Sequence, residues 1–283
     1  MPFRDKLAGA ETRSGSLLCV GLDPYLVEPG LVADFNRSIV EETCDLVSSY
    51  KPNLAIYEGM GPAGMKALEA TIQCVPADIP VIGDGKRGDI ENCGRSYAEA
   101  LFGKYGLNLD AVTINPYMGQ EVVAPFQQYW PDKMLLILCR TSNPRSTETQ
   151  LLETRGLDGV VRPLYLEFAR QAMGWGTPQN MGLVVGATFP DELRRVRQEF
   201  PDVLLLIPGL GAQGGSVESA VEAAADVHGA GFILSASRAV TFAAGDPSSV
   251  TRQNLGTFAR AARRSALEYR DRINNARAFA TVS

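Results

Sequence analysis

The chain has 283 residues, 45% of them hydrophobic, and its 27 basic and 32 acidic residues give a formal net charge of −5. This acidic balance, without any basic run, argues against a nucleic-acid-binding surface. No apolar run approaches the roughly 20 residues that span a bilayer, and the first residues lack the apolar segment of a secretory signal, so we expect a cytoplasmic protein that does not act at a membrane.

Cysteine and histidine, which commonly bind zinc or take part in nucleophilic catalysis, are few in this chain. The five cysteines are scattered without a C-x-x-C pair and are expected to be reduced thiols: Cys19, Cys44, Cys74, Cys93 and Cys139. His228 is the only histidine, so a Ser-His-Asp triad would depend on this one residue and a zinc site would lack ligands. We therefore predict no metal site.

Short apolar runs bounded by turn residues alternate with helical patterns along the chain. Eight strands are predicted, at residues 17–21, 51–56, 81 onward, 111–114, 134–139, 181–186, 203–207 and 231–234. Helices are predicted at residues 31–50, 62–72, 92–105, 119–129, 160–173, 190–200 and 254–273. The polar stretch 141–154 is predicted to be a long loop and a candidate lid, and the last ten residues are expected to fray.

Eight strands alternating with helices over this length match a (β/α)8 TIM barrel in number and size. A doubly wound open sheet is the alternative, because a strand count alone does not prove that a sheet closes. No linker or change in composition marks a boundary, so we expect a single domain over residues 1–283.

Three charged residues follow the predicted third strand within six positions: Asp84, Lys86 and Asp89. Side chains two apart on a strand share a face, so Asp84 and Lys86 should point the same way, while Asp89 lies on the turn into the next helix. Such groups, if buried together, shift one another's proton affinity, which suits proton transfer or repulsion of an anionic substrate group. The alternative is a solvated loop with surface ion pairs.

In a barrel, reactive groups lie at the carboxyl ends of the strands. Asp23 after the first strand and Ser142 after the fifth strand occupy such positions. Lys51 belongs to the second strand and needs a carboxylate partner if it points inward, and Asp23, Asp84 and Asp89 are the candidate partners. The alternative for Lys51 is an ammonium that points outward into water.

A glycine-rich segment, residues 208–216, follows the predicted seventh strand. It contains a G-x-G-x-x-G pattern, which is a weak dinucleotide signal here because no acidic residue for a ribose follows on the next strand. Barrels commonly bind phosphate with the loops after strands seven and eight, so Gln213 and Arg238 form a candidate phosphate site. The alternative is a glycine-rich turn beside a surface arginine.

With these motifs the chain resembles the orotidine 5′-phosphate decarboxylase family, and its insertions are similar to those of the larger bacterial subclass. The resemblance rests on Leu22-Asp23-Pro24, Lys51, Asp84-x-Lys86-x-x-Asp89-Ile90, Pro208-Gly-x-Gly-Ala-Gln-Gly-Gly215 and Ser237-Arg238. These motifs run in family order from the first predicted strand to the eighth. The resemblance therefore covers nearly the whole chain.

The resemblance implies cofactor-free decarboxylation of orotidine 5′-monophosphate (OMP) to uridine 5′-monophosphate (UMP) by a homodimer. Lys86 would protonate C6 of the pyrimidine, and Asp84 would crowd the substrate carboxylate and hold Lys86. Asp89 would reach across the dimer interface into the partner's site. The remaining implied contacts are Lys51 and Asp23 with the ribose, Gln213 and Arg238 with the phosphate, Ser142 with the base, and Ile90 elsewhere on the substrate.

One position departs from the family pattern. The family often has a threonine four residues after the second motif aspartate, and this chain has Cys93 there. A thiol is a poor hydrogen-bonding substitute for a hydroxyl, so Cys93 is not included in the predicted site.

Three other functions share features with this sequence pattern. Magnesium-dependent sugar-phosphate decarboxylases or hexulose-phosphate synthases share the D-x-K-x-x-D element, but they place an acid where this chain has Lys51. A class I aldolase would use Lys86 as a Schiff base, which needs a neutral amine that two flanking carboxylates disfavour. A catalytically inactive, phosphate-ligand-binding barrel is the third alternative.

Overall fold

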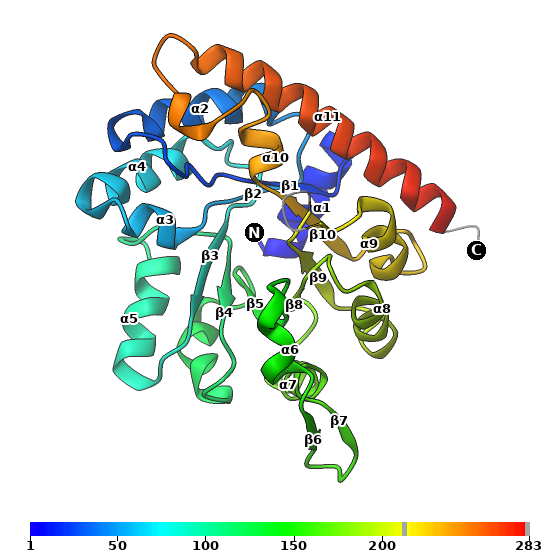
Figure 1. Cartoon of the computed structure of the whole chain (residues 1–283). Coiled ribbons are helices and arrows are strands. Elements are labelled where there is room, and N and C mark those ends of the chain that lie inside the picture. Colours follow the sequence, from blue (N-terminus) through cyan, green and yellow to red (C-terminus); the bar gives the residue numbers. More distant parts are fainter. Residues whose placement is uncertain (211–213, 281–283) are drawn as a thin grey trace.

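Eight parallel strands form one sheet that curls into a nearly closed barrel with helices outside it (Figure 1). In this computed structural model, which describes residues 1–210 and 214–280, the strands follow the order β2-β1-β10-β9-β8-β5-β4-β3. A parallel bridge between Tyr50 and Val81 brings the two end strands together. The strands are β1 (Leu18–Gly21), β2 (Ser49–Lys51), β3 (Ile82–Arg87), β4 (Ala111–Ile114), β5 (Met134–Arg140), β8 (Met181–Val185), β9 (Leu204–Ile207) and β10 (Phe232–Ala236). The predicted TIM barrel is confirmed.

The helices lie around this sheet, and a separate hairpin projects from the body (Figure 1). The α-helices are α1 (Phe3–Ser14), α2 (Val32–Thr43), α3 (Leu54–Glu58), α4 (Gly61–Cys74), α5 (Glu91–Phe102), α6 (Thr147–Gln150), α7 (Leu164–Met173), α8 (Pro190–Glu199), α9 (Val217–Ala224), α10 (Arg238–Thr241) and α11 (Leu255–Ala280). The 3-10 helices are η1 (Pro29–Leu31), η2 (Gln120–Val122), η3 (Ala124–Tyr129), η4 (Pro144–Ser146) and η5 (Pro247–Ser249). The hairpin consists of the antiparallel strands β6 (Glu153–Arg155) and β7 (Val161–Pro163).

Alternation along each strand divides the apolar core into two layers. In β9, Leu204 and Leu206 belong to the cluster that fills the barrel interior, whereas Leu205 and Ile207 pack in the cluster beneath the helices. Helix α1 contributes Phe3 to the interior cluster, where its ring is fully buried. Burial of such a side chain contributes about 1.5–3 kcal/mol, so α1 both covers and stabilises one end of the barrel.

The second strand differs from its prediction at both ends. Residues 49–51 form β2, so the predicted strand at 51–56 is wrong. The helix predicted at 31–50 ends at Thr43. Pro52 has no N–H for a ladder bond, and the Asn53 side chain then accepts a hydrogen bond from Ala55 N, which begins α3. This shift places Lys51 at the carboxyl end of its strand, the end at which barrels hold reactive groups.

Several other boundaries also differ. Residues 119–129 form two 3-10 helices, with Pro125 in the first turn of the longer one, instead of one α-helix. The predicted loop at 141–154 contains η4, α6 and part of β6, and the helix predicted from residue 160 begins only after β7. The last helix continues to Ala280, so the expected fraying of the last ten residues is wrong for residues 274–280.

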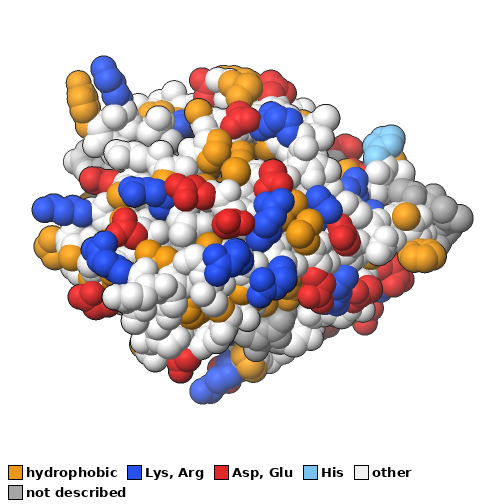
Figure 2. All heavy atoms as spheres, turned by 90° about the horizontal axis from the view of Figure 1, so that it is seen from above, with side chains coloured by type: hydrophobic (Ala, Val, Ile, Leu, Met, Phe, Trp, Pro, Cys, Tyr) orange, Lys and Arg blue, Asp and Glu red, His pale blue; other side chains and the backbone are white. Residues whose placement is uncertain are grey.

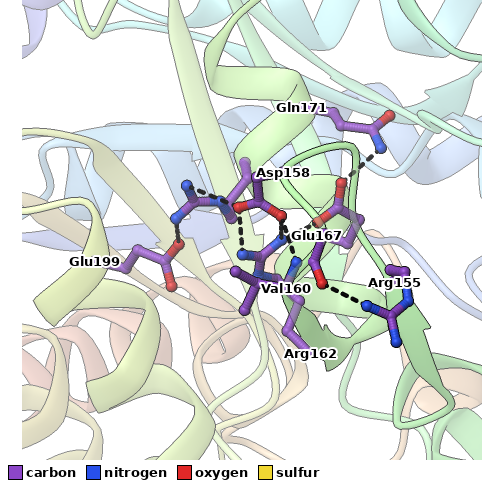
Figure 3. Close-up of polar contacts among 9 residues, drawn as sticks. Arg155, Asp158, Val160, Arg162, Glu167, Gln171 and Glu199 are labelled. Carbon is purple, nitrogen blue, oxygen red and sulfur yellow. Dashed lines mark hydrogen bonds and ion pairs between the residues drawn. The ribbon is translucent and has the colours of Figure 1, made fainter.

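The projecting β6–β7 hairpin is anchored by a nearly buried arginine (Figure 3). The Arg162 guanidinium donates hydrogen bonds of 2.6 Å to both Asp158 and Glu167. Glu167 also accepts a hydrogen bond from Gln171 on the next turn of α7. A two-stranded hairpin alone is marginally stable; the bond from Arg162 to Asp158 braces its loop, and the bond from Arg162 to Glu167 ties it to α7.

Figure 2 shows acidic and basic side chains interspersed across the face seen from above, as expected for a chain with a small negative net charge. Among the described residues, no helix is long and apolar enough to cross a membrane.

Helix α1 also carries a carboxyl group that makes stability depend on pH. Burial raises the pKa of Glu11 from its ordinary 4.5 to about 7, although the Arg4 and Arg277 guanidinium groups oppose the shift. The Glu11 carboxyl therefore ionises at a lower pH in the unfolded chain than in the folded one. As a result, Glu11 reduces the free energy of unfolding progressively between pH 4.5 and about 7, and by a constant amount above pH 7.

We expect Glu11→Gln to increase the free energy of unfolding by up to about 3 kcal/mol at pH 8 and to change it little at pH 4. Urea unfolding of parent and variant at both pH values measures this difference. Glu69→Gln, at an exposed position on α4, is the matched control and should change the free energy of unfolding little. An equal effect of Glu11→Gln at both pH values would contradict the prediction.

Candidate active site

A cavity of about 580 Å³ opens at the carboxyl ends of the barrel strands. Its lining combines charged groups on β2, on β3 and just after β1 with apolar side chains such as Val184 and Leu206 from the barrel interior. Six of the predicted site residues line it: Asp23, Lys51, Asp84, Lys86, Ser142 and Arg238. The volume lies in the usual range for small-molecule sites, roughly 300–1,000 Å³.

Asp84 is the centre of the charged array. One of its carboxylate oxygens, Oδ1, lies 2.5 Å from Lys86 Nζ, and the other, Oδ2, lies 3.2 Å from Lys51 Nζ. The Lys51 side chain is only 5% exposed and that of Asp84 only 13%, whereas the Lys86 side chain is 48% exposed. Lys86 is therefore the member of the array that can meet a ligand most directly.

The array is held in its charged form. Burial would raise the pKa of Asp84, but the ammonium groups of Lys51 and Lys86 outweigh this effect and lower that pKa well below its ordinary value. Burial would likewise lower the pKa of Lys51, but Asp84 and Asp23 together raise it. At neutral pH the site therefore presents a fixed carboxylate between two fixed ammonium groups.

Asp23 shapes the cavity wall beside β2. Its Oδ1 accepts a 2.9 Å hydrogen bond from the backbone N–H of Asn53, which follows Lys51 by two residues. Asn53 also lines the cavity. The carboxylate of Asp23 therefore links the end of β1 to the start of α3 and adds negative charge near Lys51.

The segment after β5 carries Ser142 and Asn143 into the cavity. Arg140, which is fully buried, donates to Gln150 Oε1 at 3.1 Å, and Gln150 in turn bonds both the backbone N–H and the hydroxyl of Thr141. Gly186 passes so close that a Cβ there would lie 2.9 Å from Ser142 backbone atoms. The position of Ser142 is thus set by a buried guanidinium and by a glycine with no side chain.

The described residues include only part of the predicted phosphate site. Pro208, Gly209 and Leu210 after β9 line the cavity together with Arg238 after β10. Gln213 lies outside the described residues. Ser237, next to Arg238, also lines the cavity, so the described part offers backbone, hydroxyl and guanidinium groups suited to an anion.

Asp89 and Ile90 stand apart from the other predicted residues. Both are half-buried, and Asp89 Oδ1 accepts a hydrogen bond from Ile90 N, but neither lines the cavity formed by the described residues of one chain. Cys93, four residues after Asp89, is exposed on α5.

Several cavity residues were not among the predicted site residues, namely Tyr25, Asn53, Thr113, Asn143 and Ser237. Thr113 had a signal, because it is the one polar side chain in the apolar strand Ala111-Val-Thr-Ile114. A hydroxyl in a buried strand needs a hydrogen-bonding partner, which here is the charged array.

Fold and site together define a (β/α)8-barrel enzyme with a lysine–aspartate array at the carboxyl ends of its strands.

Comparison with known proteins identifies the family. A model of the orotidine 5′-phosphate decarboxylase / HUMPS family matches residues 16–253. A protein from Thermomicrobium roseum named orotidine 5′-phosphate decarboxylase is 43% identical over 286 residues, which cover 98% of this chain and 96% of that one. The chain therefore belongs to the orotidine 5′-phosphate decarboxylase / HUMPS family.

Solved structures with similar sequences have the same fold as this chain. The Leishmania donovani OMP decarboxylase has a TM-score of 0.83 at 37% identity, with 98% of this chain and 99% of that chain covered. The structure of Leishmania donovani UMP synthase has a TM-score of 0.84 at 39% identity. The match covers 98% of this chain but 57% of the longer synthase chain.

Proposed function

We propose that the chain decarboxylates OMP to UMP in pyrimidine biosynthesis, without a cofactor and with Lys86 as the proton donor to C6. The observation that carries this proposal is the Asp84 carboxylate, held 2.5 Å from Lys86 Nζ inside the cavity. The relatives that match nearly end to end carry the name of this activity. The barrel over residues 1–283 acts as one domain in this proposal.

The array suits a reaction in which negative charge moves from a carboxylate to a carbon. When the bond from C6 to the carboxylate breaks, carbon dioxide leaves and the electron pair stays on C6. The Lys86 ammonium stabilises that developing charge and then transfers a proton to C6, which leaves a neutral amine. A preorganised cation of this kind is commonly the largest single contribution to catalysis.

Asp84 adds a second contribution. Its fixed charge beside the substrate carboxylate raises the energy of the bound substrate, and the repulsion disappears as carbon dioxide forms. Phosphate binding by Arg238, Gln213 and the segment after β9 offsets the cost of holding two anions close together, because that energy comes from a part of the substrate that does not react.

The metal-dependent sister enzymes are disfavoured by Lys51. Its ammonium lies in the cavity 3.2 Å from Asp84, where it would repel a divalent cation that Asp84 could otherwise bind. The aldolase alternative needs Lys86 Nζ as a free nucleophile, whereas this atom lies in an ion pair 2.5 Å from the Asp84 carboxylate.

Loss of OMP absorbance, followed with EDTA present, tests the proposed function. Turnover that survives EDTA supports the cofactor-free reaction. Activity that requires added magnesium would transfer the assignment to the metal-dependent enzymes. UMP binding without any turnover of OMP would instead indicate a barrel that only binds phosphate ligands.

We further propose that the chain acts in the cytoplasm as a homodimer in which Asp89 completes the partner's site. Two inactive variants, Lys86→Ala and Asp89→Asn, should then regain activity when they are mixed under conditions that exchange subunits. In each mixed dimer one site has both intact residues, so random exchange should restore about a quarter of the parent activity, given one intact site per mixed dimer. A mixture no more active than its components, or a fully active monomer by light scattering, would contradict this proposal.

A further inference from the structure

The ladder between β3 and β4 has a gap at the charged array. Gly83 pairs with Val112 and Arg87 pairs with Ile114, so residues 84–86 on β3 lie opposite the single residue Thr113 on β4. Within this gap Lys86 adopts φ +48°, a left-handed conformation that is uncommon for a residue with a side chain. Such a conformation persists only where the surroundings hold it, and residues of this kind cluster at functional sites.

The Thr113 side chain fills this gap. Its hydroxyl oxygen accepts a 2.9 Å hydrogen bond from the backbone N–H of Lys86 and donates a 3.0 Å hydrogen bond to Asp84 Oδ1. Thr113 is 1% exposed overall, yet its side chain forms part of the cavity wall. One hydroxyl therefore satisfies the Lys86 N–H that the ladder leaves without a backbone partner and orients the Asp84 carboxylate.

The direction of the two bonds is important. Because the hydroxyl accepts from Lys86, its single proton is available for Asp84. Asp84 Oδ1 consequently receives two donors, the Thr113 hydroxyl and Lys86 Nζ, while Oδ2 faces Lys51. The backbone of Lys86 and the carboxylate that holds the same residue's ammonium are joined through one side chain.

We infer that Thr113 is a positioning residue for the decarboxylation: its hydroxyl fixes the Lys86 backbone and the Asp84 carboxylate so that the ammonium meets C6. The inference rests on the proposed roles of Asp84 and Lys86. Thr113 acts through these two residues, because its single hydroxyl proton is donated to Asp84 and not to the substrate. Displacing a reacting group by about 1 Å can cost roughly 100-fold in rate, so the geometry of this hydroxyl affects kcat more than binding.

Thr113→Val tests the inference, because valine keeps the shape of threonine and removes the hydroxyl. We expect kcat on OMP to fall about 10- to 100-fold, given the steep dependence of rate on geometry. KM should change less than kcat, and UMP affinity should stay close to the parent value, because binding of the phosphate and base uses other residues. Thr113→Ser, which restores the hydroxyl, should recover most of the lost kcat.

Thr71→Val is the matched control. Thr71 is fully buried on α4 and its hydroxyl accepts a 2.9 Å hydrogen bond from Asn36, away from the cavity. This variant should lose stability but retain kcat per folded molecule. If Thr113→Val does not fold, the pair Thr113→Ser and Thr113→Cys makes the same comparison by replacing one oxygen with sulfur, a weak donor and acceptor.

The outcomes separate this inference from the proposed function. A parent chain that does not turn over OMP rejects the function itself. An active parent with a Thr113→Val variant of equal kcat, or with a Thr113→Ser variant as impaired as Thr113→Val, overturns only the role of Thr113.

Discussion

Lys86→Ala should lower kcat on OMP by about 10⁴-fold or more, because one substitution removes both the proton donor and the cation nearest the developing charge. Each effect alone is commonly worth roughly 10²- to 10⁴-fold. The 48% exposure of the Lys86 side chain indicates that its removal leaves the protein core intact. Spectrophotometric assay of purified parent and variant, with EDTA present, measures the difference.

Lys66→Ala is the control for a lost lysine, since Lys66 is exposed on α4 and does not line the cavity. It should retain full activity. UMP binding to the Lys86→Ala variant, measured by calorimetry, shows whether the cavity still forms. Substantial turnover by the Lys86→Ala variant would reject Lys86 as the proton donor and direct attention to Lys51.

The barrel was predictable from sequence because parallel strands buried on both faces appear as continuous apolar runs. Ala111–Ile114 is an example: its predicted and observed bounds coincide. The second strand was misplaced because the apolar run that follows Lys51 belongs to α3, which begins with the Asn53 cap after Pro52. Local pattern alone cannot distinguish a short apolar strand from a short buried helix.

The charged array was predictable in its members but not in its geometry. Alternation along a strand put Asp84 and Lys86 on one face, and the two side chains do contact each other. The left-handed backbone of Lys86 and the gap opposite Thr113 depend on the pairing of β3 with β4, which is a tertiary property that no spacing within one strand shows. A polar side chain in an apolar strand marks Thr113 in the sequence, but its place in the charged array depends on this pairing.

Contacts between residues on different strands are likewise not visible in the sequence. Lys51 and Asp84 are 33 positions apart in the chain, and their 3.2 Å contact exists only because β2 and β3 close the barrel. The sequence indicates Asp23, Asp84 and Asp89 as possible partners for Lys51 but does not distinguish among them. In the structure Asp84 forms the direct ion pair, and Asp23 bonds the backbone of Asn53 instead.

Asp84→Asn should separate the two contributions of the array. The variant loses the anion between Lys51 and Lys86, so we expect kcat to fall about 10³-fold as Lys86 loses its orienting partner. Repulsion of the substrate carboxylate also disappears, so OMP should bind at least as tightly as to the parent, whereas UMP, which has no carboxylate, should gain nothing. Stability should fall by about 3 kcal/mol or more, because the buried Lys51 loses its ion-pair partner.

Equilibrium binding of both nucleotides, single-turnover kinetics and urea unfolding measure these effects separately. Asp110→Asn is the matched control, because Asp110 forms a 2.8 Å ion pair with Lys6 and does not line the cavity. That variant should lose stability and leave OMP affinity and kcat per folded molecule unchanged. If Asp84→Asn weakens OMP and UMP binding equally, ground-state repulsion has no part in the reaction, and the function of Asp84 is to hold Lys86 in place.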